Sequence, residues 1–177
     1  DTWHEPVRPE QIVGQRPGAR PGILDFDEVV VSVDATFGTE TDDASDVGVL
    51  TFGTRGATAC LADAYAEKAS LEATIAEAKR QIGLWRATQC LVELKANGRS
   101  VIVALERALA DGEIRDAAGR PVICEVIPVE PQGGKLARAH GVQHMVSAGL
   151  VLLREGAPWL EKFIAQAAAF PNATLDD

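Results

Sequence analysis

The spacing of apolar residues changes near residue 70, and this change restricts the folds that the chain can adopt. Before it, three segments rich in β-branched and apolar residues are predicted to be strands, at 29–33, 47–53 and 58–65. Their short connections favour an antiparallel meander. After it, helical and strand patterns alternate, and parallel strands joined through helices need right-handed crossovers. The sequence therefore predicts an α/β fold whose mixed sheet combines the antiparallel meander with parallel crossover strands and is flanked by helices.

The helical part begins behind Ser70, which is placed to cap the N-terminus of a helix over 70–87. Its apolar residues recur at helical spacing and are predicted to face the core: Leu71, Ile75, Ala78, Ile82 and Trp85. The elements predicted after it are strand 90–94, helix 99–112, strand 121–129, helix 135–145, strand 150–153 and a last helix that opens at Pro158.

The first 24 residues have a different composition. Residues 1–24 hold four prolines and three glycines and show no helical or strand period, which is typical of a linker or arm. Residues 25–177 are then expected to form one domain, and the arm is expected to follow a preceding domain. The N-terminus has no secretory pattern and no run is long and apolar enough to cross a bilayer, so neither secretion nor membrane insertion is predicted.

The formal net charge is −9 and the pI is about 4.8. This charge argues against a general nucleic-acid coat protein, because such proteins neutralise phosphates with Lys and Arg. The negative net charge does not exclude an enzyme that binds DNA along one basic strip, because acidic residues clustered for metal binding also make the net charge more negative. No Walker A motif is present, so the chain is not expected to hydrolyse ATP.

Four acidic residues stand out by position. Asp34 ends the first predicted strand, and Glu93 lies in the strand 90–94, which crossover wiring allows to run parallel beside it; Asp176 and Asp177 end the chain. None has an evident cationic partner nearby in the sequence. Crowded carboxylates must take up protons or share a cation, and oxygen ligands suit Mg²⁺ or Mn²⁺. Taken singly, Asp34 also fits a turn or helix cap, and acidic tails are usually solvated.

The order of these motifs resembles a known family. A strand ending in Asp34, a strand with Glu-x-x-x-Asn-Gly at 93–98, and Phe-Pro-x₄-Asp-Asp at 170–177 resemble the C-terminal nuclease domain of the large terminase subunit of tailed bacteriophages. That domain has a ribonuclease H-like fold, and the similarity covers about residues 25–177. The resemblance extends to a Lys-x-x-Arg helix that begins at Lys135.

The resemblance implies a metal-dependent DNA endonuclease that cuts concatemeric viral DNA during genome packaging. Asp34, Glu93, Asp176 and Asp177 would hold the catalytic Mg²⁺ or Mn²⁺, as two ions. Implied partners are double-stranded DNA, an N-terminal packaging ATPase domain of the same full-length chain, the small terminase subunit and the portal, with no membrane. The implied location is the host cytoplasm, within the packaging motor.

Several basic residues are weaker candidates. Lys135 and Arg138 share one helix face and either contact the DNA backbone or form an ordinary solvated surface; Arg99 is a similar case. Asp46 is a peripheral candidate ligand, although a turn acid is favoured. Two other functions stay open: a ribonuclease H-like resolvase or RNA:DNA hybrid nuclease, and a non-catalytic docking domain.

Overall fold

The structure is a computed structural model that describes residues 26–35, 47–95 and 98–169. Its strands are β1 (Glu28–Asp34), β2 (Val47–Arg55), β3 (Thr58–Glu67), β4 (Gln89–Glu93), β5 (Glu125–Val129) and β6 (Val151–Leu153). Its helices are α1 (Leu71–Trp85), α2 (Gly98–Ala110), α3 (Lys135–Ser147) and α4 (Leu160–Ala169). The predicted arm at 1–24 lies outside the described residues.

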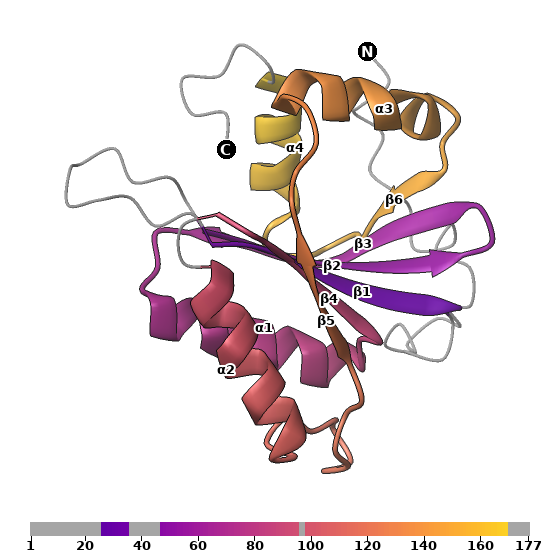
Figure 1. The fold of residues 1–177 in the computed structure, drawn as a ribbon. Coiled ribbons are helices and arrows are strands. Elements are labelled where there is room, and N and C mark those ends of the chain that lie inside the picture. The colour runs from indigo at the N-terminus through magenta and orange to yellow at the C-terminus, as the bar shows by residue number, and fades with distance from the viewer. Residues whose placement is uncertain (1–25, 36–46, 96–97, 170–177) are drawn as a thin grey trace.

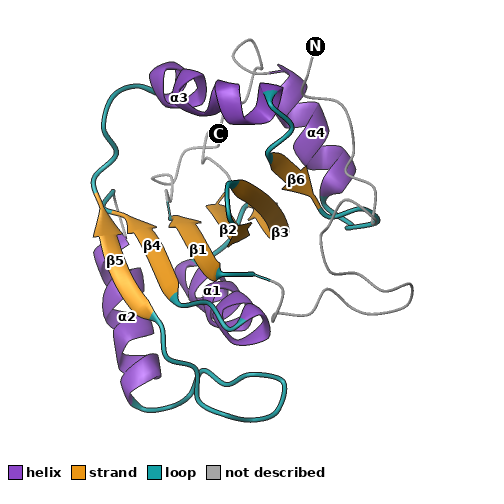
Figure 2. Ribbon diagram, turned by 90° about the vertical axis from the view of Figure 1, so that its right-hand side faces the viewer, coloured by secondary structure: helices purple, strands orange, loops and turns teal. Residues whose placement is uncertain are grey.

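The strands form one mixed sheet in the order β5-β4-β1-β2-β3-β6 (Figure 2). β1, β2 and β3 pair antiparallel, whereas β4 runs parallel to β1, and β5 runs parallel to β4. β6 adds to the opposite edge, parallel to β3. The predicted combination of a meander with parallel crossover strands is therefore confirmed, and β1 and β4 are neighbours in the sheet.

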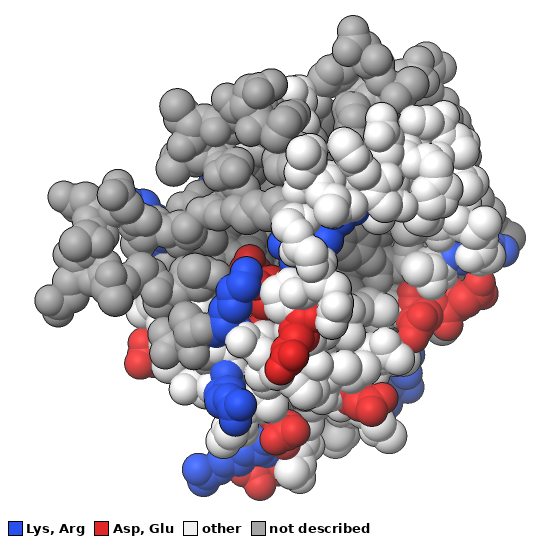
Figure 3. All heavy atoms as spheres, turned by 45° about the horizontal axis from the view of Figure 1, so that its top comes forward, with Lys and Arg blue, Asp and Glu red and all other residues white. Residues whose placement is uncertain are grey.

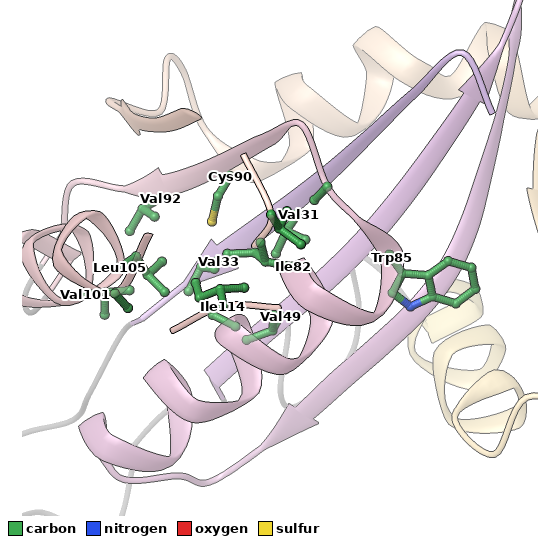
Figure 4. Close-up of a cluster of buried hydrophobic side chains, with 14 of the residues drawn as sticks. Val31, Val33, Val49, Ile82, Trp85, Cys90, Val92, Val101, Leu105 and Ile114 are labelled. Carbon is green, nitrogen blue, oxygen red and sulfur yellow. The ribbon is translucent and has the colours of Figure 1, made fainter. Parts of the chain in front are cut away.

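Helices cover both faces of the sheet (Figure 1). α1 and α2 lie on one face, where the larger core forms, and α3 and α4 lie on the other. Figure 4 shows the larger core, in which valines of β1, β2 and β4 meet Ile82 of α1 and Leu105 of α2. A smaller core around Leu61 and Leu153 packs under α4. The predicted core position of Trp85 is confirmed, because its side chain is buried.

Helix α1 begins as the sequence predicts, with Ser70 Oγ accepting a hydrogen bond from the backbone N–H of Ala73. It ends at Trp85, since Arg86 adopts a left-handed conformation with φ of 51°. The predicted apolar stripe of α1 does not include every residue on the buried face of the helix. The polar residues Thr74 and Gln81 are fully buried, because each of them has hydrogen-bond partners within the fold.

Two predicted boundaries are wrong. The strand predicted at 121–129 begins only at Glu125, because the preceding segment forms a tight turn around Asp116 and leaves Ile123 93% exposed. The last helix begins at Leu160 rather than at Pro158, and the backbone N–H of Leu160 bonds to the carbonyl of Ala157 in a turn. None of the helices in the described part of the chain is both long and apolar enough to cross a membrane.

Candidate functional site

Asp34 and Glu93 end two neighbouring parallel strands. The pairing of β1 with β4 runs from Val30 opposite Gln89 to Val33 opposite Val92. Asp34 directly follows Val33, and Glu93 directly follows Val92. The two acidic residues therefore lie side by side at the carboxyl ends of β1 and β4. The sequence-based expectation that these two residues are lateral neighbours is thereby confirmed.

The two side chains also share a face of the sheet. Val33 and Val92 are buried in the core under α1 and α2, and successive side chains of a strand point to opposite faces. Asp34 and Glu93 therefore point to the other face, which carries α3 and α4 (Figure 1). Beside Asp34 in β2 lies Gly48, which has no side chain to fill the space next to the carboxylate.

The N-terminus of α2 packs tightly against the backbone of Glu93. A Cβ atom added at Gly98 would overlap the carbonyl oxygen of Glu93, so only glycine fits at this position. The backbone N–H of Gly98 bonds to the carbonyl of Lys95, and that of Leu94 bonds to the carbonyl of Val129. The end of β4 is thus held by the start of α2 on one side and by β5 on the other.

Glu93 has a cationic neighbour that the sequence analysis did not assign. The side chain of Glu93 is only 15% exposed, and the Lys95 Nζ atom lies 2.5 Å from its Oε1 atom. The expectation of no local cationic partner was wrong for this residue. The spacing of Glu93 and Lys95 in the sequence indicates this contact, because residues two positions apart in an extended segment point to the same side.

A groove of about 570 Å³ begins at Asp34 and crosses β2 and β3 toward α4. Trp159, Lys162 and Gln166 line its α4 side. The ammonium of Lys162 donates a hydrogen bond to the carbonyl of Ala66, which fixes α4 against the end of β3. Glu93 is not among the residues that line this groove, so the groove approaches the pair from the Asp34 side.

Arg80 of α1 also lines the groove, but its charge is compensated. Its guanidinium donates to Glu77 and Asp63, and these hydrogen bonds, first that of Glu77, raise the pKa of Arg80 above its usual range. Lys162 is the other basic residue among the described residues that line the groove. On the face drawn in Figure 3, basic and acidic side chains of the described residues are interspersed rather than gathered into one basic patch.

Two of the predicted basic candidates, Arg99 and Arg138, are not among the described residues that line the groove at Asp34. Arg99 is an exposed residue in the first turn of α2 and lines a separate hollow of about 680 Å³ together with Lys79 and Arg107. Arg138 is exposed on α3. Lys135 begins α3, so the predicted start of the Lys-x-x-Arg helix is confirmed. Their role in DNA binding stays a prediction.

Three other predicted ligands, Asp46, Asp176 and Asp177, lie outside the described residues. Within the described residues, no group of three or more His, Cys, Asp or Glu side chains is arranged to hold a metal ion. The described part of the site therefore offers the pair Asp34 and Glu93.

This pair fits a hard divalent cation. Both ligands are carboxylates, and Mg²⁺ and Mn²⁺ prefer oxygen donors. The Glu93 Oε1 atom is buried, and the Lys95 ammonium at 2.5 Å shows that a cation already compensates its charge there. A divalent cation could supply the same compensation.

Comparisons with known proteins agree with the fold. The family model described as terminase RNaseH-like domain matches residues 31–175. A human cytomegalovirus terminase nuclease domain, Mn soaked and inhibitor bound, is similar with a TM-score of 0.59 and 12% identity, over 83% of this chain and 75% of that one. A second structure of a human cytomegalovirus terminase nuclease domain gives 0.57 and 11%, over 85% and 77%. The predicted ribonuclease H-like fold is confirmed. A comparison with curated proteins gives no match.

Proposed function

The chain belongs to the terminase RNase H-like domain family, and on this basis we propose that it is a metal-dependent endonuclease domain of a large terminase subunit. Its substrate is double-stranded DNA, which it cuts by hydrolysis of phosphodiester bonds. The observation that carries the proposal is the neighbouring position of Asp34 and Glu93 at the ends of β1 and β4. A rigid sheet holds such ligands with the precision that catalysis needs.

Asp34 and Glu93 would hold the metal, and Asp176 and Asp177 would complete the ligand set. Bound Mg²⁺ or Mn²⁺, proposed as two ions, supplies an activated water and stabilises the leaving oxygen. The residues of the chain bind and orient the substrate. The groove beside Asp34 would receive the DNA strand, and Gly48 would leave room next to the carboxylate.

Cleavage of supercoiled plasmid tests this proposal. The wild-type chain should nick and linearise plasmid in Mn²⁺ or Mg²⁺ and should be inactive in EDTA. Asp34→Asn and Glu93→Gln keep the side-chain shapes but remove the charge, so each should lower the cleavage rate by about a hundredfold or more. Glu125→Gln is the matched control, because Glu125 is an exposed acid at the opposite end of the same parallel strands; it should cleave like the wild type.

Metal-dependent cleavage that survives Asp34→Asn would refute the assignment of the site. Substrate choice tests the nature of the nuclease, because a packaging nuclease should cut plain duplex. Cleavage confined to four-way junctions or RNA:DNA hybrids would instead identify a resolvase or hybrid nuclease. An absence of both cleavage and Mn²⁺ binding would favour a docking domain.

The biological setting is part of the same proposal. The domain would cut concatemeric viral DNA during genome packaging in a tailed bacteriophage, working in the host cytoplasm with a packaging ATPase domain of the same full-length chain. The small terminase subunit and the portal would be its further partners. Lys135, Arg138 and Arg99 would contact the DNA backbone, and the acidic net charge of −9 implies that the ATPase domain or the assembled motor contributes much of the grip on DNA.

A further inference from the structure

The ion pair between Lys95 and Glu93 brings a cation to the proposed metal-binding carboxylate. The Lys95 Nζ atom lies 2.5 Å from the Glu93 Oε1 atom. The Lys95 side chain is 54% exposed, whereas that of Glu93 is 15% exposed. The lysine therefore reaches from solvent to a largely buried acid, on a flexible stem that can swing away without disturbing the core.

This contact compensates charge but does not complete the hydrogen bonding of the carboxylate. The Glu93 Oε1 atom is buried and has no hydrogen-bond partner among the described residues, so the ammonium approaches it without the alignment of a hydrogen bond. The pair of Lys79 with Glu113 differs, because there the lysine donates a hydrogen bond of 2.9 Å to an exposed acid. The Lys95 contact is thus an ion pair, and it occupies the oxygen that a metal ligated by Glu93 would also approach.

We propose that Lys95 is a built-in competitor of the metal: it neutralises Glu93 in the metal-free protein and is displaced from Oε1 when a divalent cation binds. The inference rests on the proposed function, since it takes Glu93 as a metal ligand. An ammonium and a divalent cation repel each other when both lie at contact distance from one carboxylate oxygen. Lys95 is accordingly a positioning residue that acts through Glu93, and it lowers the affinity of the site for metal.

The competition has two measurable consequences. Removing the ammonium removes the cost of displacing it, so the metal should bind more tightly. Removing it also leaves the buried Glu93 charge without its neighbour, so the metal-free protein should be less stable. A lysine that served only the fold would lower stability without raising metal affinity.

Calorimetric titration of the metal-free chain with Mn²⁺, without DNA, tests the first consequence. Lys95→Met should bind Mn²⁺ about threefold to tenfold more tightly than the wild type, as expected for loss of a partly exposed ion pair. Lys95→Arg keeps the charge and should stay close to the wild type. Lys79→Met is the control, because it removes a lysine from another ion pair, with Glu113, that includes neither Asp34 nor Glu93; its affinity for Mn²⁺ should be unchanged.

Thermal unfolding tests the second consequence. In EDTA, Lys95→Met should unfold at a lower temperature than the wild type, and saturating Mn²⁺ should raise its unfolding temperature by more than it raises that of the wild type. The gain in affinity should also vanish in the Glu93→Gln background, where the pair no longer exists.

The outcomes separate the two proposals. If the wild type binds Mn²⁺ through Glu93 but Lys95→Met binds no more tightly, the competitor role is overturned and the proposed function stands. An equal gain in Lys79→Met would show a general effect of charge and would also overturn the role. If Glu93→Gln binds Mn²⁺ as well as the wild type, Glu93 is not a ligand, and both the site assignment and the inference fail.

Discussion

At the scale of single residues, the position of Glu93 depends on a glycine five residues later. Gly98 begins α2 directly against the Glu93 carbonyl, and the space there excludes even a methyl group. The glycine therefore sets how closely the helix approaches the end of β4. It affects the proposed metal site through the backbone, although it carries no functional group of its own.

Gly98→Ala should be destabilising, because the added methyl forces β4 and α2 apart. Overpacking of this kind lowers the free energy of unfolding by about 1–3 kcal/mol, and the shifted Glu93 should bind Mn²⁺ more weakly. Urea denaturation and Mn²⁺ titration measure the two effects. Gly141→Ala is the control: Gly141 lies inside α3 with nothing within 4 Å of an added Cβ, so alanine there should stabilise the protein. Equal stability of the two variants would contradict this account of Gly98.

At the scale of elements, α1 is attached to the sheet by a buried polar contact as well as by apolar packing. The Gln81 Nε2 atom donates to the carbonyl of Val49 at 3.2 Å, and the Gln81 Oε1 atom accepts from the hydroxyl of Thr51. Both side chains are fully buried. The contact fixes α1 relative to β2, because a helix that slid along the sheet would leave these groups without partners.

Gln81→Met should leave the Thr51 hydroxyl buried without its partner and lower the free energy of unfolding by about 1–3 kcal/mol. Adding Thr51→Val removes the unpaired hydroxyl. The double variant should therefore lose less free energy of unfolding than the sum of the losses in the two single variants. Urea denaturation of all four proteins gives the coupling energy. Additive losses, within about 0.5 kcal/mol, would show that the two residues do not depend on each other.

The turn between α2 and β5 depends on a charged residue. Asp116 accepts hydrogen bonds from the side chain of Arg120 at 2.9 Å and from the backbone N–H groups of Arg120 and Ala118. These bonds, first that of the Arg120 side chain, hold the pKa of Asp116 below its usual range. The folded protein therefore binds this proton more weakly than the unfolded chain does. The resulting stabilisation is present above the pKa of the unfolded state and is lost as the pH falls through the lower pKa of the folded state.

Asp116→Asn should accordingly lower the unfolding temperature at pH 7, and its difference from the wild type should narrow as the pH falls below about 4. Thermal unfolding at several pH values between about 2.5 and 7 measures the effect, because this range spans the usual pKa of an aspartic acid. Asp111→Asn is the control, because Asp111 is exposed and only approaches Arg107 at 3.6 Å. A difference for Asp116→Asn that stays constant with pH would contradict the role of its charge.

At the scale of the whole molecule, the two faces of the sheet are built differently. The face under α1 and α2 holds the larger core, whereas the other face has a smaller core under α4. The side chains described on α3 are exposed or half-buried. The proposed site opens on this second, less densely packed face, where a substrate can approach the carboxylates.

Hydrogen exchange should reflect this asymmetry. Amides of β1, which lies between β4 and β2 and contributes Val29, Val31 and Val33 to the larger core, should exchange slowest. Amides of α4 should be intermediate, and those of α3 should exchange fastest. Mass spectrometry of exchanged peptides provides the order. If the amides of α3 were as protected as those of β1, α3 would have to pack in solution against a further surface, beyond its contacts in this structure.

Features that depend on neighbours in the chain were predictable from the sequence alone. The change of apolar spacing near residue 70 predicted the meander and the crossover strands, and Ser70 predicted the start of α1. Asp34 was predicted at a strand end for the same reason. Such signals succeed because strand period, helix period and capping depend on residues a few positions apart.

Features that depend on residues far apart in the chain were decided by the tertiary structure. The burial of Gln81 required Thr51 and Val49 from another element, and the late start of β5 followed from the turn around Asp116. The close fit of Gly98 against the Glu93 carbonyl likewise appeared only once β4 and α2 had packed. Local sequence specifies which residues can end a strand or cap a helix, but packing determines which side chains meet and which charges are left for a ligand.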